Sequence, residues 1–468
     1  MKTTEIRNCA FCCHYDGKLC RLLNENIQDP VCVIECQYWN KEELRFQGVA
    51  NAIMMGEIKT YDANFIFNRG VAYKDIGAAE EAIEDFSAAI NLNPEFKEAY
   101  FERGNVYYAL KQYESANANY SYVLLIDNEY VNAYLKKGDA YSQMEQYEEA
   151  IKNYSTVLGL SPKHADALFN RGIAYYYLGQ YESAIRDYSN AIAIDAQYIK
   201  AYFNRGGAYH GLGQFDKALA DYSMVIETDP NDRSIYLNRG IVYQSLDQPE
   251  QAIKDFSKAA DIDPDSADAY YNRAIAYGEL GRNEDSIIDN SRVIEIDPNF
   301  SEAYFNRGNA YARMGKFEDA IRDYEIAAEI DPTYPLYLYW GNAYAKIEKF
   351  DKAMDCYSKM IELEPDNTEA YYNRGGVYAH LEKYEDAVAI YTTLIKIDPR
   401  HSRAYFQRGN AYVHLEEYES AIADYSMVIE LEPSYVYAYE NRALVLEALG
   451  EFQRAKSDRN KAKHLVSI

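Results

Sequence analysis

Long apolar runs are missing from this chain of 468 residues. No stretch approaches the roughly 18 apolar residues that a membrane-spanning helix needs, and the first eleven residues hold no apolar core of an export signal. Histidine is scarce, with seven residues, and the sequence has neither a nucleophile motif nor a glycine-rich phosphate loop. We therefore expect a cytoplasmic protein that has no enzymatic activity and does not bind membranes.

Basic residues are also in short supply. Lys and Arg number 48 against 74 Asp and Glu, which gives a net charge of −26. A field of this sign repels nucleic acid and raises the encounter rate with basic partners. We expect a basic protein or peptide partner and no nucleic acid. Alternatively, acidic outer helices only keep a long chain soluble.

Cysteine is almost confined to the first 36 residues, which hold six of the seven. A chain without an export signal rarely forms disulfides, so this cluster indicates a metal site. Four thiolates could form the tetrahedral site that zinc prefers: Cys9, Cys12, Cys20 and Cys36. Further candidate ligands are Cys13, His14 and Cys32. An iron–sulfur cluster, redox sensing and ordinary thiols are the alternatives.

The cysteine segment resembles small cysteine modules in which C-x2-C, a His-Tyr pair, a further cysteine, an Asp-Pro pair and a final cysteine recur. The resemblance implies a metal-binding module over residues 1–40. Residues 41–62 are predicted to form a helical connector or cap, because Leu44, Val49 and Ile53 can cover whatever follows.

A period of 34 residues dominates the rest of the chain. Asn-Arg-Gly at 68–70 recurs at 170–172, 204–206, 238–240 and 306–308. When each copy is aligned so that its glycine or alanine is position 8, twelve copies cover residues 63–468, with one residue deleted near Tyr334. Position 8 is Gly70, Gly104, Gly138, Gly172, Gly206, Gly240, Ala274, Gly308, Gly341, Gly375, Gly409 and Ala443. A fixed period of this length predicts a solenoid of stacked repeats.

Each copy is predicted to contain two antiparallel helices. Apolar residues at positions 4, 8 and 11 share one face of a first helix, and those at 20, 24 and 27 share one face of a second. Glycine at position 8 costs roughly 1 kcal/mol of helix propensity, so a packing reason must lie behind it. A proline at position 32, as in Pro94, Pro162 and Pro230, separates the copies.

This pattern of aromatic, small residue, tyrosine, alanine, aromatic and proline resembles the tetratricopeptide repeat. The resemblance implies an all-α fold, a right-handed superhelical solenoid of antiparallel helix pairs. It also implies a concave groove, lined by the first helices, that binds peptides or proteins and performs no chemistry.

Positions 7 and 23 are predicted to form an ion pair inside each copy, because both lie eight residues from the turn. Position 7 is Arg in every copy that has Asp at position 23, and in the ninth copy Trp340 and Cys356 replace both charges. The Asp residues are Asp85, Asp187, Asp221, Asp255, Asp289, Asp323, Asp424 and Asp458. Arginine suits such partly buried, bidentate pairs.

Asparagines at positions 6 and 9 are the candidate partner-binding residues. They lie on the stripe of positions 2, 6, 9 and 13 that lines the groove in the family. The candidates are Asn68, Asn105, Asn170, Asn204, Asn238, Asn272, Asn306, Asn342, Asn373, Asn410 and Asn441. Such a ladder resembles that of O-linked sugar transferases and can hold a peptide main chain. The alternative is that these amides bond neighbouring helices. The family's carboxylate clamp needs Lys at position 5, which is absent here.

Departures from the pattern predict weak points. The seventh copy has Ser286 and Asn290 where alanine and an aromatic are expected, and the sixth has Pro249 at position 17. The last helix is rich in Lys and Arg and is predicted to be a polar cap.

Two functions therefore remain in view. The first is a non-enzymatic scaffold that binds peptide or protein partners in the groove. The alternative is a metal- or redox-responsive regulator, in which the cysteine module controls partner binding by the repeats.

Overall fold

In the computed structural model, the described residues are 62–333 and 336–466, and they form helices and no strand. The chain divides into two compact units, the first ending at Pro230 and the second beginning at Asn231. The cysteine module and the connector predicted over residues 1–40 and 41–62 lie outside the described residues, apart from Asp62.

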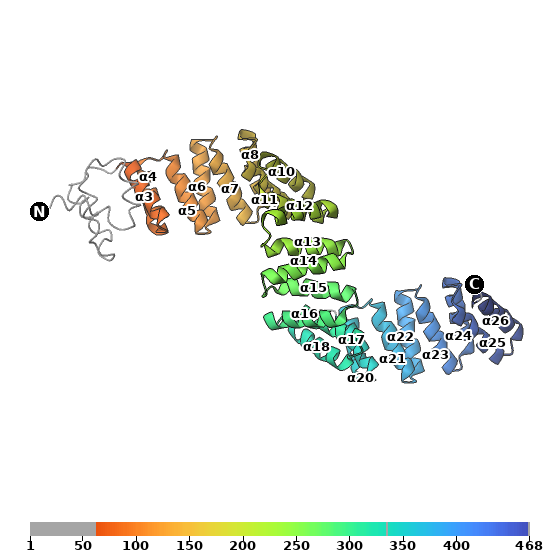
Figure 1. Cartoon of the computed structure of the whole chain (residues 1–468). Helices are drawn as coiled ribbons and strands as arrows, with labels where there is room; N and C mark the ends of the chain where they lie inside the picture. The colour runs from red at the N-terminus through yellow and green to blue at the C-terminus, as the bar shows by residue number, and fades with distance from the viewer. Residues whose placement is uncertain (1–61, 334–335, 467–468) are drawn as a thin grey trace, which may run out of the picture. The chain divides into compact units, whose positions relative to one another are not determined.

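Among its described residues the first unit contains five consecutive helix pairs, coloured orange to olive green in Figure 1. Their bounds are α3 Ala63–Asp75, α4 Ala79–Leu92, α5 Lys97–Ala109, α6 Tyr113–Ile126, α7 Val131–Gln143, α8 Tyr147–Leu160, α9 Ala165–Tyr177, α10 Tyr181–Ile194, α11 Ile199–Gly211 and α12 Phe215–Thr228.

The second unit contains seven pairs. Their bounds are α13 Arg233–Ser245, α14 Pro249–Ile262, α15 Ala267–Glu279, α16 Asn283–Ile296, α17 Ser301–Arg313, α18 Phe317–Ile330, α19 Tyr337–Lys346, α20 Phe350–Leu363, α21 Thr368–His380, α22 Tyr384–Ile397, α23 Ser402–His414, α24 Tyr418–Leu431, α25 Val436–Ala448 and α26 Phe452–Val466. In both units each helix packs on the next one along the chain, as the repeat pattern predicts.

The turn inside each pair reverses the chain through one residue with positive φ. Glycine fills this place in six copies, for example Gly179 at φ 71° and Gly213 at φ 69°. Other copies place Lys or a carboxylate residue there, as at Lys111 with φ 60°. A left-handed residue after the first helix is a common way to end a helix tightly.

Position 8 is glycine because the ring at position 24 of the same copy lies against it. A Cβ atom on any of the ten position-8 glycines would lie only 2.5 to 3.0 Å from that ring, for instance 2.6 Å from Tyr188 at Gly172. The two copies with alanine instead, Ala274 and Ala443, have Asn290 and Arg459 at position 24. Glycine and the aromatic ring therefore occur together, a coupling that the helix periodicity alone does not reveal.

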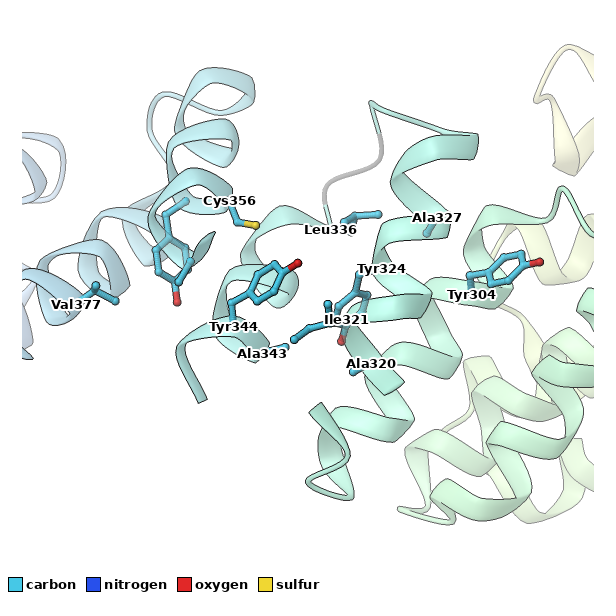
Figure 2. Packing of buried hydrophobic residues seen from close by; sticks show 12 residues of the cluster. Tyr304, Ala320, Ile321, Tyr324, Ala327, Leu336, Ala343, Tyr344, Cys356 and Val377 are labelled. Carbon is cyan, nitrogen blue, oxygen red and sulfur yellow. The ribbon is translucent and has the colours of Figure 1, made fainter. Parts of the chain in front are cut away.

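The core repeats this interlock along each unit. The position-24 rings are at most 2% exposed, and nearly all alanines at position 20 are fully buried. Figure 2 shows the cluster at the eighth and ninth copies, where Tyr324 and Ile321 of α18 lie beside Ala343 of α19. α19 has 10 residues where the other first helices have 13, consistent with the deletion read from the sequence.

The ion pairs predicted between positions 7 and 23 are confirmed in all eight copies. In each one the Arg donates from Nε and Nη2 to the two carboxylate oxygens over 2.5 to 2.9 Å. Most of these arginines also donate from Nη1 to a hydroxyl of the preceding copy, as Arg171 does to Ser155 over 2.9 Å. One guanidinium thus connects three helices.

The two predicted weak points differ. The prediction at Pro249 was wrong, because this proline is the first residue of α14, where a missing N–H leaves no hydrogen bond unmade. In the seventh copy, Asn290 is fully buried and its Oδ1 has no hydrogen-bond partner in the described part of the chain. Its Nδ2 donates to the carbonyl of Ser286 over 2.9 Å. The structure thus shows a buried polar pair in place of a ring.

Candidate binding face

The candidate asparagines lie on one stripe of the first helices, at positions 2, 6, 9 and 13, which we call the first-helix face. Hydrogen bonding divides most of them into two groups. One group bonds across to the next repeat, and the other bonds only within its own helix.

The first group forms a relay of three side chains. In the third copy the Tyr154 hydroxyl donates to Asp139 over 2.9 Å, and Asn170 of the fourth copy donates its Nδ2 to the same carboxylate over 3.0 Å. The acceptor at position 9 therefore joins the buried ring of its own copy to position 6 of the next. Burial raises the pKa of the relay tyrosines, that of Tyr425 to about 12, so their hydroxyls keep the proton that they donate.

The relay recurs at two further places in the second unit. Tyr357, Asn342 and Asn373 are joined over 2.8 and 2.9 Å, and Tyr425, Asn410 and Asn441 over 2.8 and 3.0 Å. Asn105 forms only the first half, accepting from Tyr120 over 3.0 Å. At these positions the alternative in which the amides bond neighbouring helices is what the structure shows.

The second group is Asn204, Asn238 and Asn272. Each donates its Nδ2 over 2.8 Å to the carbonyl four residues earlier in its own helix. Their carboxamide oxygens accept no hydrogen bond in the described part of the chain. The preceding copies carry Ile173, Gly207 and Ile241 at position 9, which offer no side-chain acceptor.

The remaining two candidates behave differently. Burial raises the pKa of the Tyr271 side chain of the preceding copy, and the nearby Asn306 partly opposes this rise. Asn68 is exposed at the start of the described residues. Where the preceding copy has Asp or Asn at position 9, the asparagine at position 6 joins the relay, so the sequence carried a signal that its position alone did not.

The described residues contain neither a candidate metal site nor an exposed cysteine. Among them, no group of three or more His, Cys, Asp or Glu side chains could hold a metal ion. The one cysteine they include, Cys356, is buried, and burial raises the pKa of its thiol to about 12. The predicted ligands Cys9, Cys12, Cys20 and Cys36 lie outside the described residues, as do Cys13, His14 and Cys32. No helix described here is long and apolar enough to cross a membrane.

Models of the tetratricopeptide repeat match most of the chain. A model described as TPR repeat matches residues 70–111, 138–179, 172–213, 341–382 and 409–450. Models described as tetratricopeptide repeat match 206–274, 267–300, 301–334, 368–401 and 390–423. The chain belongs to the tetratricopeptide repeat proteins.

Several solved structures resemble the chain. A Parabacteroides merdae protein shares 19% identity with a TM-score of 0.42, over 53% of this chain and 98% of its own. YrrB, titled a TPR protein with an unusual peptide-binding site, shares 28% with a TM-score of 0.36, over 39% and 95%. Yeast Tom70 shares 16% with a TM-score of 0.36, over 87% and 99%. No curated protein sequence matches.

Proposed function

We propose that this tetratricopeptide repeat protein is a non-enzymatic scaffold that binds extended polypeptides on its first-helix face. The observation that supports this is the second group of asparagines. Asn204 in the first unit, and Asn238 and Asn272 in the second, present carboxamide oxygens that accept no hydrogen bond from the described residues.

A carboxamide oxygen can accept a hydrogen bond from a backbone N–H, which every residue except proline carries. Neighbouring helices pack about 8 to 10 Å apart, and an extended chain advances about 3.3 Å per residue. One asparagine per repeat would therefore meet about one in three ligand residues. Such contacts grip the main chain with little regard to sequence.

The charge of the chain favours a basic ligand. A net charge of −26 attracts basic segments and repels nucleic acid at a distance. We expect this to affect association rates more than the bound geometry, because exposed charges are screened within about 8 Å at physiological salt.

The test uses the full chain on an array of basic 15-residue peptides of varied sequence. Replacing Asn238 and Asn272 together with alanine should weaken binding about tenfold across the whole array, because the main chain is what they hold. The melting temperature should stay nearly constant. The matched control is Asn373→Ala, whose relay bond to Asn342 should make it lower the melting temperature instead. Unchanged array binding, or a melting loss equal to that of the control, contradicts the proposal.

The cysteine cluster supports a second proposal, in which the N-terminal module binds zinc and controls partner binding by the repeats. Six of seven cysteines in 36 residues favour it. The full chain should then hold stoichiometric zinc that Cys9→Ala and Cys36→Ala remove, and chelation should change peptide binding. Metal-free protein with reactive thiols contradicts the idea. We further propose a cytoplasmic location, in which such thiols stay reduced.

A further inference from the structure

A row of tyrosines lies against α11, the helix that carries Asn204, in the first unit. The tyrosine row consists of Tyr147, Tyr176, Tyr177 and Tyr181, from the facing ends of α8, α9 and α10. The rings of Tyr147 and Tyr177 stack with centroids 5.1 Å apart and an interplanar angle of 9°. Tyr176 meets Tyr177 and Tyr181 edge-on, over 6.0 and 5.3 Å. Tyr177 is nevertheless 64% exposed, so one ring face is open to a ligand.

The next first helix, α11, is bare on the corresponding stripe. Position 2 of this copy is the exposed Lys200, and positions 6, 9 and 13 are Asn204, Gly207 and Gly211, so beyond Lys200 the stripe holds only one carboxamide and two glycines. Gly211 has a packing reason, because a Cβ there would lie 2.9 Å from the Tyr181 ring.

Gly207 has no such reason. A Cβ at this position would meet only ordinary contacts, 3.6 Å from the Tyr222 hydroxyl and 3.7 Å from Tyr176. Glycine inside a helix costs roughly 0.5 to 1 kcal/mol relative to alanine. Glycine lets a ligand approach the backbone closely, so a glycine that packing does not require suits a contact site.

From this geometry we propose that the tyrosine row and the glycine stripe of α11 bind a proline-rich segment with basic residues among its prolines. The proposal rests on the peptide-binding function above and names its ligand in the first unit. Pyrrolidine rings pack flat on aromatic faces, and a polyproline II segment has no internal hydrogen bonds.

The polar groups around the row match such a segment. Burial raises the pKa values of Tyr147 and Tyr176, so both hydroxyls stay protonated and can donate to ligand carbonyls. The Asn204 oxygen can accept an N–H from a residue between prolines. Glu145 lies close enough to Tyr147 to raise its pKa further, so a Lys or Arg of the ligand finds an opposite charge there.

Fluorescence polarisation with the full chain tests the proposal, using one labelled peptide of repeated Lys-Pro-Pro and a second of repeated Lys-Ala-Ala with equal charge. The proline peptide should bind about tenfold more tightly. Tyr177→Ala and Gly207→Leu should each weaken its binding about tenfold or more, because the first removes a central aromatic contact and the second fills the bare stripe.

Two variants of the second unit serve as controls. Tyr437 is 65% exposed, close to the 64% of Tyr177, and Gly376 occupies position 9, as Gly207 does, and also meets no close contact. Tyr437→Ala and Gly376→Leu should leave binding of the proline peptide unchanged. All four variants should keep the melting temperature of the parent within a few degrees.

Three results would overturn the inference: equal binding of the two peptides, no binding of either, or equal losses from the control variants. If the two peptides bind equally and the double variant Asn238→Ala, Asn272→Ala abolishes that binding, the scaffold function stands and only the proline preference is lost. Loss of array binding in that variant, with proline binding intact, is the opposite outcome and supports the inference.

Discussion

Single residues set the spacing inside each repeat, and the glycine at position 8 does so most directly. Gly172→Ala would place a Cβ 2.6 Å from the Tyr188 ring. Alanine favours the helix by about 1 kcal/mol, but overpacking a tight core costs about 1 to 3 kcal/mol. We expect a net loss of stability in urea unfolding. Gly207→Ala is the control, because its Cβ meets only ordinary contacts and should be neutral or stabilising.

The seventh repeat offers the reverse experiment at the same scale. Asn290→Tyr alone should destabilise, because the new ring would meet the Ala274 side chain, while Ala274→Gly alone costs about 1 kcal/mol of propensity. Together they should restore the pattern of the other repeats and stabilise by about 1 to 3 kcal/mol, since the buried polar atom is replaced by a packed ring. Urea unfolding of the two single variants and the double variant measures the coupling. Additive effects would show that the ring and the glycine are independent.

At the scale of helices, the sequence predicted the elements and their order well, because a 34-residue period repeated twelve times averages out local ambiguity. The ion pairs could be predicted from the same 34-residue period, because positions 7 and 23 are equidistant from the turn. The relay did not. Recognising it requires knowing that position 9 of one repeat faces position 6 of the next, which is a contact between repeats. The prediction that Pro249 is a weak point was wrong because the effect of a proline depends on where the helix begins, here α14.

The helix α16 should be a locally weak element of the second unit. It carries Ser286 and Asn290 in the core, where α18 carries Ala320 and Tyr324. Stability in a repeat array is nearly a sum over repeats and their interfaces, so a poorer interface opens more often. Hydrogen exchange should be faster for amides 286–292 than for amides 320–326. Equal protection would mean that the Ser286 and Asn290 hydrogen bonds compensate for the missing ring.

At the scale of the whole molecule, the buried tyrosine that recurs in the repeats should make the stability of the fold depend on pH. Eight repeats bury a tyrosine at position 24, and burial raises the pKa of each from its ordinary value of 10.0. The neutral ring is thus favoured in the folded state. A group whose pKa is raised by folding contributes stability that is complete below its unfolded pKa and is lost as the pH rises above it.

We therefore expect stability to change little through neutral pH on account of these rings, and to fall steeply above about pH 10, the ordinary pKa of tyrosine. Absorbance at the tyrosinate band and helical circular dichroism, followed together from pH 8 upward, measure this. The buried position-24 rings should ionise only as helix is lost. A single titration of all tyrosines with the helices preserved would contradict the argument, because it would mean that the position-24 rings ionise in place.

Replacing Tyr188 with phenylalanine, as the first and sixth repeats have at this position, should shift the loss of helix to higher pH. That ring is the sharpest choice because its hydroxyl has no partner in the described part of the chain, so the substitution removes an ionisable group without breaking a hydrogen bond.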